Sequence, residues 1–191
     1  MAENMYVARL TEHHQPYGGT SRMKTLGVQG RKVLKICHLC LAGIWLGGAV
    51  TLNIMVLELG PAESGPQLNG YDLARMFVDD YVITPAALGC LLSGLLIGWL
   101  TPWGFFKHRW VTVKLILTIV CILVGTFALG PMINDQPALS LEQGLAALRN
   151  PVYASNISGA LLGGIALVLM IIFMTVISVL KPWQKKNRTN A

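Results

Sequence analysis

Apolar residues gather in four long blocks, and polar residues fill the segments between them. The blocks predict helices over residues 33–57, 82–100, 111–133 and 154–180. One helix needs roughly 20 mainly apolar residues to cross a bilayer, and each block meets or approaches that length. A helix also satisfies its own backbone hydrogen bonds, which lipid cannot do. The pattern therefore predicts an all-α, integral membrane four-helix bundle with up-and-down topology.

Two of the connections between blocks also contain apolar positions at helical spacing. Residues 68–80 and 139–149 predict short interfacial helices that lie on the outer surface of the bilayer. Pro85 and Pro151 follow these segments as helix punctuation. The remaining connection, residues 101–110, is short and predicts a turn.

The composition favours a membrane protein over a soluble one. Hydrophobic residues make up 53% of the chain and charged residues only 13%, whereas a soluble domain carries about 25% charged residues. The net charge is +6, and the basic residues lie beside the apolar blocks, where the positive-inside bias accounts for them. Anionic headgroups are natural partners for such charges. We therefore expect a lipid bilayer, and no nucleic acid, as a partner.

The distribution of charge predicts an orientation. Lysine and arginine concentrate in the two tails, at the start of the first block and in the 101–110 turn, whereas most acidic residues lie in the two longer connections. This predicts cytoplasmic N- and C-termini in a bacterial inner (plasma) membrane. The expected organisation is an N-terminal tail over residues 1–30, a membrane domain over 31–182 and a basic C-terminal tail over 183–191.

Small residues recur within the blocks, and Gly159 and Gly163 form a G-x-x-x-G pattern. Such residues let helix backbones approach closely in lipid. They serve either ordinary packing of the bundle or space for a flat ligand between helices. Because the glycine faces exceed what one small bundle needs, we expect a homodimer.

Ionisable side chains inside the apolar blocks are few, and they are the candidates for chemistry. His38 lies about one and a half turns into the first block and Lys114 near the start of the third, so both are expected near the cytoplasmic side. The imidazole is a candidate metal ligand, for haem iron in particular, and Lys114 is a candidate contact for a carboxylate such as a haem propionate. Trp45 shares the helix face of His38 and is expected as a packing wall. Two alternatives stay open: His38 hydrogen-bonds to a neighbouring helix without any ligand, and Lys114 extends to the interface.

No other histidine lies within a block, so the expected haem site is open or has a single histidine ligand. A second axial ligand would have to come from a cysteine or from one of three methionines, Met132, Met170 and Met174.

Three other polar groups have simpler interpretations. Cys37 and Cys40 are spaced as a C-x-x-C pair, but within an apolar helix they indicate packing more than metal binding. The His13–His14 pair lies in a polar tail. Asp79 and Asp80 are adjacent acids, which are more typical of a solvated helix end than of a cation site.

Two short motifs in the chain resemble a known group of proteins. Residues 34–48 read LKICHLCLAGIWLGG and residues 110–115 read WVTVKL. These stretches resemble the first and third spans of small bacterial four-helix membrane proteins of the copper-resistance D and HemJ-type group, which includes uncharacterised families. The resemblance implies that His38 is a haem b ligand and that Lys114 is a partner for carboxylates. The chain departs from the HemJ pattern because its later spans contain no histidine, which weakens the expectation of oxidase activity more than that of tetrapyrrole binding.

The function expected from these observations is a haem b-binding membrane protein in electron transfer or in haem or porphyrin handling, with a redox or complex partner. Whether it is an enzyme is left open. One alternative is a small transport or channel subunit for a metal ion or small solute. The other is a non-catalytic membrane partner or anchor subunit.

Overall fold

The computed structural model describes residues 26–57, 62–100 and 108–181, and the described part is helical without a β-strand. Most of the expected N-terminal tail, the whole basic C-terminal tail and most of the 101–110 turn lie outside the described residues. The elements follow in chain order as α2 (Val28–Leu57), α3 (Gly65–Val78), η1 (Asp79–Ile83), α4 (Thr84–Leu100), α5 (Arg109–Val124), η2 (Gly125–Leu129), α6 (Gly130–Asn134), α7 (Gln136–Gln143), η3 (Gly144–Arg149) and α8 (Pro151–Leu180).

Four helical stretches are long and apolar enough to cross a membrane, as the four apolar blocks predict. They cover Val28–Leu57, Gly65–Leu100, Arg109–Arg149 and Pro151–Leu180. Each begins before the predicted span, because polar or small residues such as Gly30 and Arg31 continue the helix beyond its apolar part.

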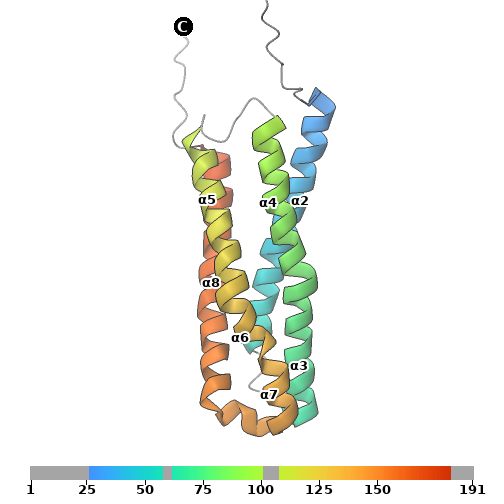
Figure 1. Ribbon diagram of the computed structural model, residues 1–191, viewed down its shortest axis with the longest axis vertical. Helices are drawn as coiled ribbons and strands as arrows, with labels where there is room; N and C mark the ends of the chain where they lie inside the picture. Colours follow the sequence, from blue (N-terminus) through green and yellow to red (C-terminus); the bar gives the residue numbers. More distant parts are fainter. Residues whose placement is uncertain (1–25, 58–61, 101–107, 182–191) are drawn as a thin grey trace, which may run out of the picture.

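The long helices lie side by side along one axis (Figure 1). Helix α2 packs against α4 and α8, and α5 packs against α8 and α4. The start of α2 lies beside the end of α4, since the backbone N–H of Leu26 donates to the carbonyl of Leu100 at 3.2 Å. At the opposite end of the molecule, α3 packs against α7.

The expected helix over residues 68–80 is present, but it belongs to a longer helix. Helix α3 passes through η1 into α4 without a break, which gives a stretch of 36 residues. A helix of this length is roughly 54 Å long, against a hydrocarbon core of about 30 Å. Over the second expected segment, residues 139–149, α7 is followed by the 3₁₀ turn η3.

Local sequence explains where α3 and α8 begin. The side chain of Ser64 accepts a hydrogen bond from the backbone N–H of Gln67 at 3.4 Å, and that of Asn150 accepts from Val152 at 2.9 Å. A proline follows each capping residue within the first two helical positions, where its missing N–H costs nothing. These caps set the positions at which α3 and α8 enter the bundle.

The core is divided along the axis. One cluster lies in the half that contains His38 and is built around the buried side chains of Trp45, Cys90, Cys121 and Met174. Two further clusters fill the other half, around Leu52 and Tyr153. Polar side chains lie within or beside these apolar layers, and their contacts define the candidate sites.

Candidate functional site

His38 lies on α2 and turns its imidazole toward α4. Its Nδ1 is 2.9 Å from the hydroxyl oxygen of Ser93, a buried residue of α4. The thiol sulfur of Cys90, one turn earlier on α4, is 3.8 Å from the same nitrogen. The hydrogen bond to a neighbouring helix, one of the two alternatives for His38, is therefore present.

The partners of Ser93 determine which nitrogen of His38 carries the proton. The Ser93 hydroxyl is 2.7 Å from the carbonyl oxygen of Gly89, to which it donates its single hydrogen. With the hydrogen on this carbonyl, the Ser93 oxygen is the acceptor for Nδ1–H of the imidazole. The other ring nitrogen, Nε2, keeps its lone pair, which is the form of histidine that binds a metal.

Glycine makes room for this imidazole on α4. A Cβ atom placed on Gly94 would lie 3.4 Å from Cε1 of His38. Such a contact is at the lower edge of ordinary packing, so the ring lies directly against the α4 backbone. Helix α4 thus both orients His38 and limits the directions in which its Nε2 can point.

Lys114 extends from α5 and is half-buried. Its ammonium group donates to the hydroxyl of Ser178 on α8 at 3.0 Å. Within the described ranges it forms no ion pair with a carboxylate. Its charge interacts electrostatically with both His38 and Cys90, so the structure brings the two predicted residues together at one end of the bundle.

Trp45 lies two turns further along α2, with only 4% of its surface exposed. It packs in the core cluster with Ala86, Ala87 and Cys90. Its indole also lines a cavity, and Lys114 is not among the residues that line it. Trp45 is therefore a core residue beside the His38 region.

The described side chains around His38 offer few ligands for a metal ion. Within the described part of the chain, no three or more His, Cys, Asp or Glu side chains gather to hold a metal ion. Met170 and Met174, considered as second ligands, instead contact the side chains of Cys121 at 3.2 Å and Thr118 at 3.5 Å. An oriented imidazole and a nearby ammonium group, which forms no ion pair among the described residues, could supply one iron ligand and one carboxylate contact of haem.

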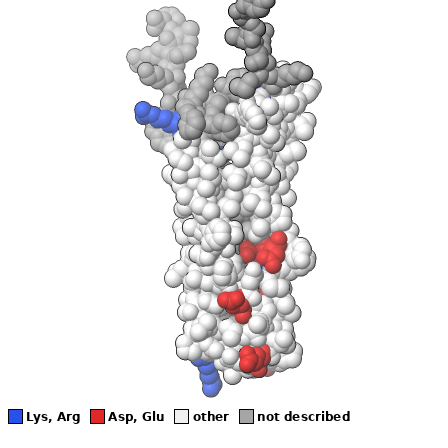
Figure 2. Space-filling model, in the orientation of Figure 1, with Lys and Arg blue, Asp and Glu red and all other residues white. Residues whose placement is uncertain are grey.

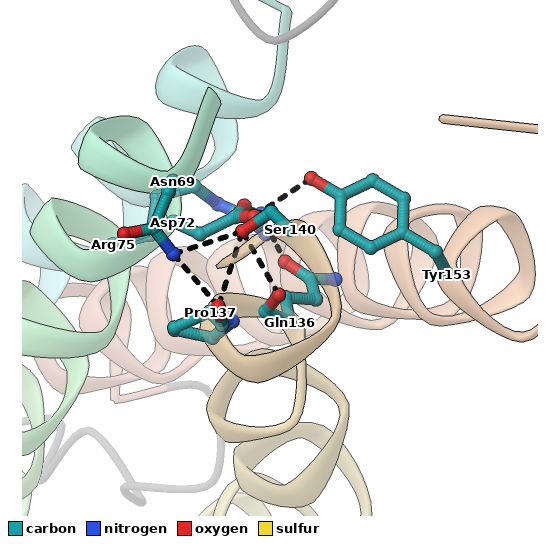
Figure 3. Close-up of polar contacts among 7 residues, drawn as sticks. All are labelled: Asn69, Asp72, Arg75, Gln136, Pro137, Ser140 and Tyr153. Carbon is teal, nitrogen blue, oxygen red and sulfur yellow. Dashed lines mark hydrogen bonds and ion pairs between the residues drawn. The ribbon is translucent and has the colours of Figure 1, made fainter. Parts of the chain in front are cut away.

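A second polar arrangement lies at the other end of the molecule (Figure 3). It is a buried network that joins α3, α7 and α8 and that the sequence pattern did not predict. Its side chains are at most 1% exposed, except that of Asn69, which is half-buried. The members are Asn69, Asp72, Arg75, Gln136, Ser140 and Tyr153.

The centre of this network is a buried ion pair. The Arg75 guanidinium lies 3.5 Å from an Asp72 carboxylate oxygen and donates to the side-chain carbonyl of Gln136. The Tyr153 hydroxyl donates to the other Asp72 oxygen at 2.8 Å. Asn69 donates to the hydroxyl of Ser140 at 3.1 Å. Each of the three helices therefore contributes at least one side chain to the network.

Arg75 was the residue in the sequence that could have indicated this network. It is one of only two basic residues in the two longer connections, and it follows Asp72 at the i,i+3 spacing that places two side chains on one helix face. Its partner Gln136 is 61 residues away along the chain, and no local pattern joins the two.

The chain matches no known protein family, no curated protein and no solved structure. The function is therefore argued from the residues themselves, and the resemblance to the copper-resistance D and HemJ-type group stays an expectation.

Proposed function

We propose that this chain is a multi-pass protein of the inner (plasma) membrane that binds haem b through His38. Four helices long and apolar enough to cross a membrane support the first part. The proposed topology is up-and-down, with both termini on the cytoplasmic side. Lysine and arginine concentrate in the two tails and in the 101–110 turn, which this topology places on the same side. His38 and Lys114 then lie toward the cytoplasmic face.

The observation that carries the haem proposal is the 2.9 Å contact between Nδ1 of His38 and the hydroxyl of Ser93. Metal-binding histidines commonly donate the second ring N–H to an oxygen acceptor, which fixes the tautomer and the ring orientation. Ser93 supplies that acceptor because its own hydrogen is donated to the Gly89 carbonyl. The iron ligand is thus Nε2 of His38, and Ser93 is a positioning residue.

Lys114 is the proposed contact for a propionate group. Ser178 accepts one hydrogen of its ammonium group, and two donor hydrogens are left for an anion. Pairing with a carboxylate would also compensate a charge that is half-buried among apolar helices. Trp45 contributes by keeping the adjacent core packed, which holds α2 and α4 at the distance that the His38–Ser93 bond requires.

Haem b, when bound, supplies one-electron redox chemistry. The chain itself would hold the group, orient it and limit its exposure to water, in electron transfer or in haem handling with a partner protein. The glycine-rich faces support the further proposal that it acts as a homodimer.

The test is an absorption spectrum of the full chain purified in detergent, oxidised and then reduced with dithionite, before and after addition of haemin. Wild type should give a Soret band and sharpened α and β bands on reduction. His38→Ala should lose them, and His108→Ala, at the start of α5, should keep them. Ser93→Ala should retain haem with an affinity lowered about 10–100-fold, the range seen when the partner of a metal-binding histidine is removed.

Two results would contradict the proposal. Wild-type protein that neither contains haem nor takes up haemin would exclude it. Equal haem binding by wild type and His38→Ala would remove His38 as the ligand.

A further inference from the structure

A cavity of about 550 Å³ lies at mid-height between α2, α4, α5 and α8. Sites for drug-sized ligands have volumes of roughly 300–1,000 Å³ and mainly apolar walls. Both π-helical segments, η1 and η2, contribute to the wall of this cavity. π-helical turns are rare, and they occur frequently at functional sites. The cavity is therefore a candidate binding site separate from that of His38.

Carboxylates lie at one side of the cavity. Asp79, which is half-buried, and Asp80, which is exposed, both come from η1 and both line it. The ion pair found among the described residues joins Arg75 to Asp72, so neither of these acids forms one there, although the Arg75 charge also attracts Asp79 electrostatically. Figure 2 shows acidic side chains along the lower half of the visible face, over the α3–η1 helix and over α6 and α7. Such a surface attracts a cation toward the cavity.

An unpaired acceptor on α2 also lines the cavity, close to Gly164 of α8. The amide nitrogen of Asn53 donates to the carbonyl of Ala49 at 2.7 Å. The amide oxygen of Asn53 is buried and has no hydrogen-bond partner, and Asn53 lines the cavity. A buried acceptor without a donor is unfavourable, and a ligand with an N–H group would supply the donor.

The rest of the cavity suits an apolar body. Trp45 lies on the same helix as Asn53, eight residues earlier, which is roughly 12 Å along the axis. Its indole and the side chains of Ala87 and Leu167 line the cavity. The separation of Trp45 and Asn53 along α2 suits a molecule with a charged head and an aromatic or aliphatic body.

We propose that this cavity binds a protonated amphipathic organic amine. Its ammonium group lies between the Asp79 carboxylate and the Asn53 amide oxygen, and its apolar body packs against Trp45. This ligand explains three features together: two acids without an ion pair among the described residues, a buried acceptor without a donor, and an indole in the cavity wall. The site is independent of the proposed haem ligand, since His38 does not line the cavity.

The test is equilibrium dialysis of the full chain in detergent micelles at neutral pH, with protein-free micelles subtracted. The probe is imipramine, a tertiary amine with a tricyclic body, and its neutral ring system iminodibenzyl is the matched control compound. Wild type should bind imipramine saturably at one site per chain and should bind iminodibenzyl at least 10-fold more weakly. A quaternary N-methyl derivative should lose several-fold in affinity, because it has no N–H to donate to Asn53.

Variants then assign the contacts. Asp79→Asn, which removes only the charge, should weaken imipramine binding at least 10-fold, and Asn53→Ala should weaken it several-fold. Glu142→Gln, an exposed acid on α7 away from the cavity, should bind as wild type does. Size-exclusion and circular dichroism profiles matching wild type show that each variant is folded. Equal binding by wild type and Asp79→Asn, equal binding of imipramine and iminodibenzyl, or no saturable binding of any of several tertiary amines would overturn the proposal.

Discussion

Replacing Arg75 with methionine would test whether the buried network at the α3–α7 end stabilises the fold. The side chain is fully buried, and its guanidinium contacts the Asp72 carboxylate and the Gln136 carbonyl. Methionine is similar in length and fills most of the volume, so the change removes charge and hydrogen bonds more than packing. Asp72 would keep its bond from Tyr153 but would lose its only counter-ion among the described residues.

The expected cost is large because one member of a buried ion pair remains. Breaking such a pair by removal of one partner costs about 3–5 kcal/mol. Adding Asp72→Asn to Arg75→Met removes the uncompensated charge and keeps an acceptor for Tyr153. The double variant should therefore be more stable than Arg75→Met alone, by about 1 kcal/mol or more, within the range of couplings between contacting residues.

The assay is reversible unfolding of the purified chain by SDS in mixed micelles, followed by circular dichroism. Arg149→Met is the matched control, because Arg149 is an exposed arginine at the same end of the molecule; its unfolding midpoint should equal that of wild type. A free energy of unfolding for Arg75→Met within about 1 kcal/mol of wild type would refute the reasoning from buried charge. A double variant no more stable than the single variant would refute the role given to Asp72.

Two further predictions use the same unfolding assay. Tyr153→Phe should cost about 1.5–3 kcal/mol, since it removes a buried hydrogen bond to a charged group, and an unchanged midpoint would contradict the 2.8 Å contact. Gly65→Ala should be destabilising by about 1–3 kcal/mol, because its Cβ would lie 2.9 Å from the Cα atom of Gly144, where backbone must move. A Cβ on Gly70 of the same helix would meet nothing within 4 Å, so Gly70→Ala should be neutral or stabilising. Equal effects of the two substitutions would count against the close approach of α3 to Gly144.

The four membrane-length helices could be predicted because each depends on a local property. An apolar block predicts by its composition alone that it is buried in lipid or protein. All four blocks are confirmed as helices long and apolar enough to cross a membrane. The continuation of α3 into α4 was harder to predict. The acids at Asp79 and Asp80 interrupt the apolar pattern and resemble a boundary, yet the helix passes through them as a π turn.

The candidate sites were predictable only in part, because their partners are distant in sequence. His38 and Lys114 were identified as rare polar residues in apolar blocks, and the structure places them within electrostatic reach. Ser93 is a small polar residue of a kind common in membrane helix packing, and no local pattern marks it as a partner of His38. Its role as acceptor depends on the register of α2 against α4, which separates the two residues by 55 positions.

The π turn η1 also makes the length of this helix as important as its composition. In η1 the backbone N–H of Thr84 bonds to the carbonyl of Asp79, five residues earlier, so one residue more than an α-helix needs is contained in that turn. One residue corresponds to roughly 100° of rotation about the axis. If that residue were deleted, η1 could close as a regular α-helix and leave Arg75 and Ser93 close to their present faces. The same deletion in the regular part of α4, before Ser93, would turn Ser93 away from His38 by that angle, and no substitution of a side chain would restore the contact.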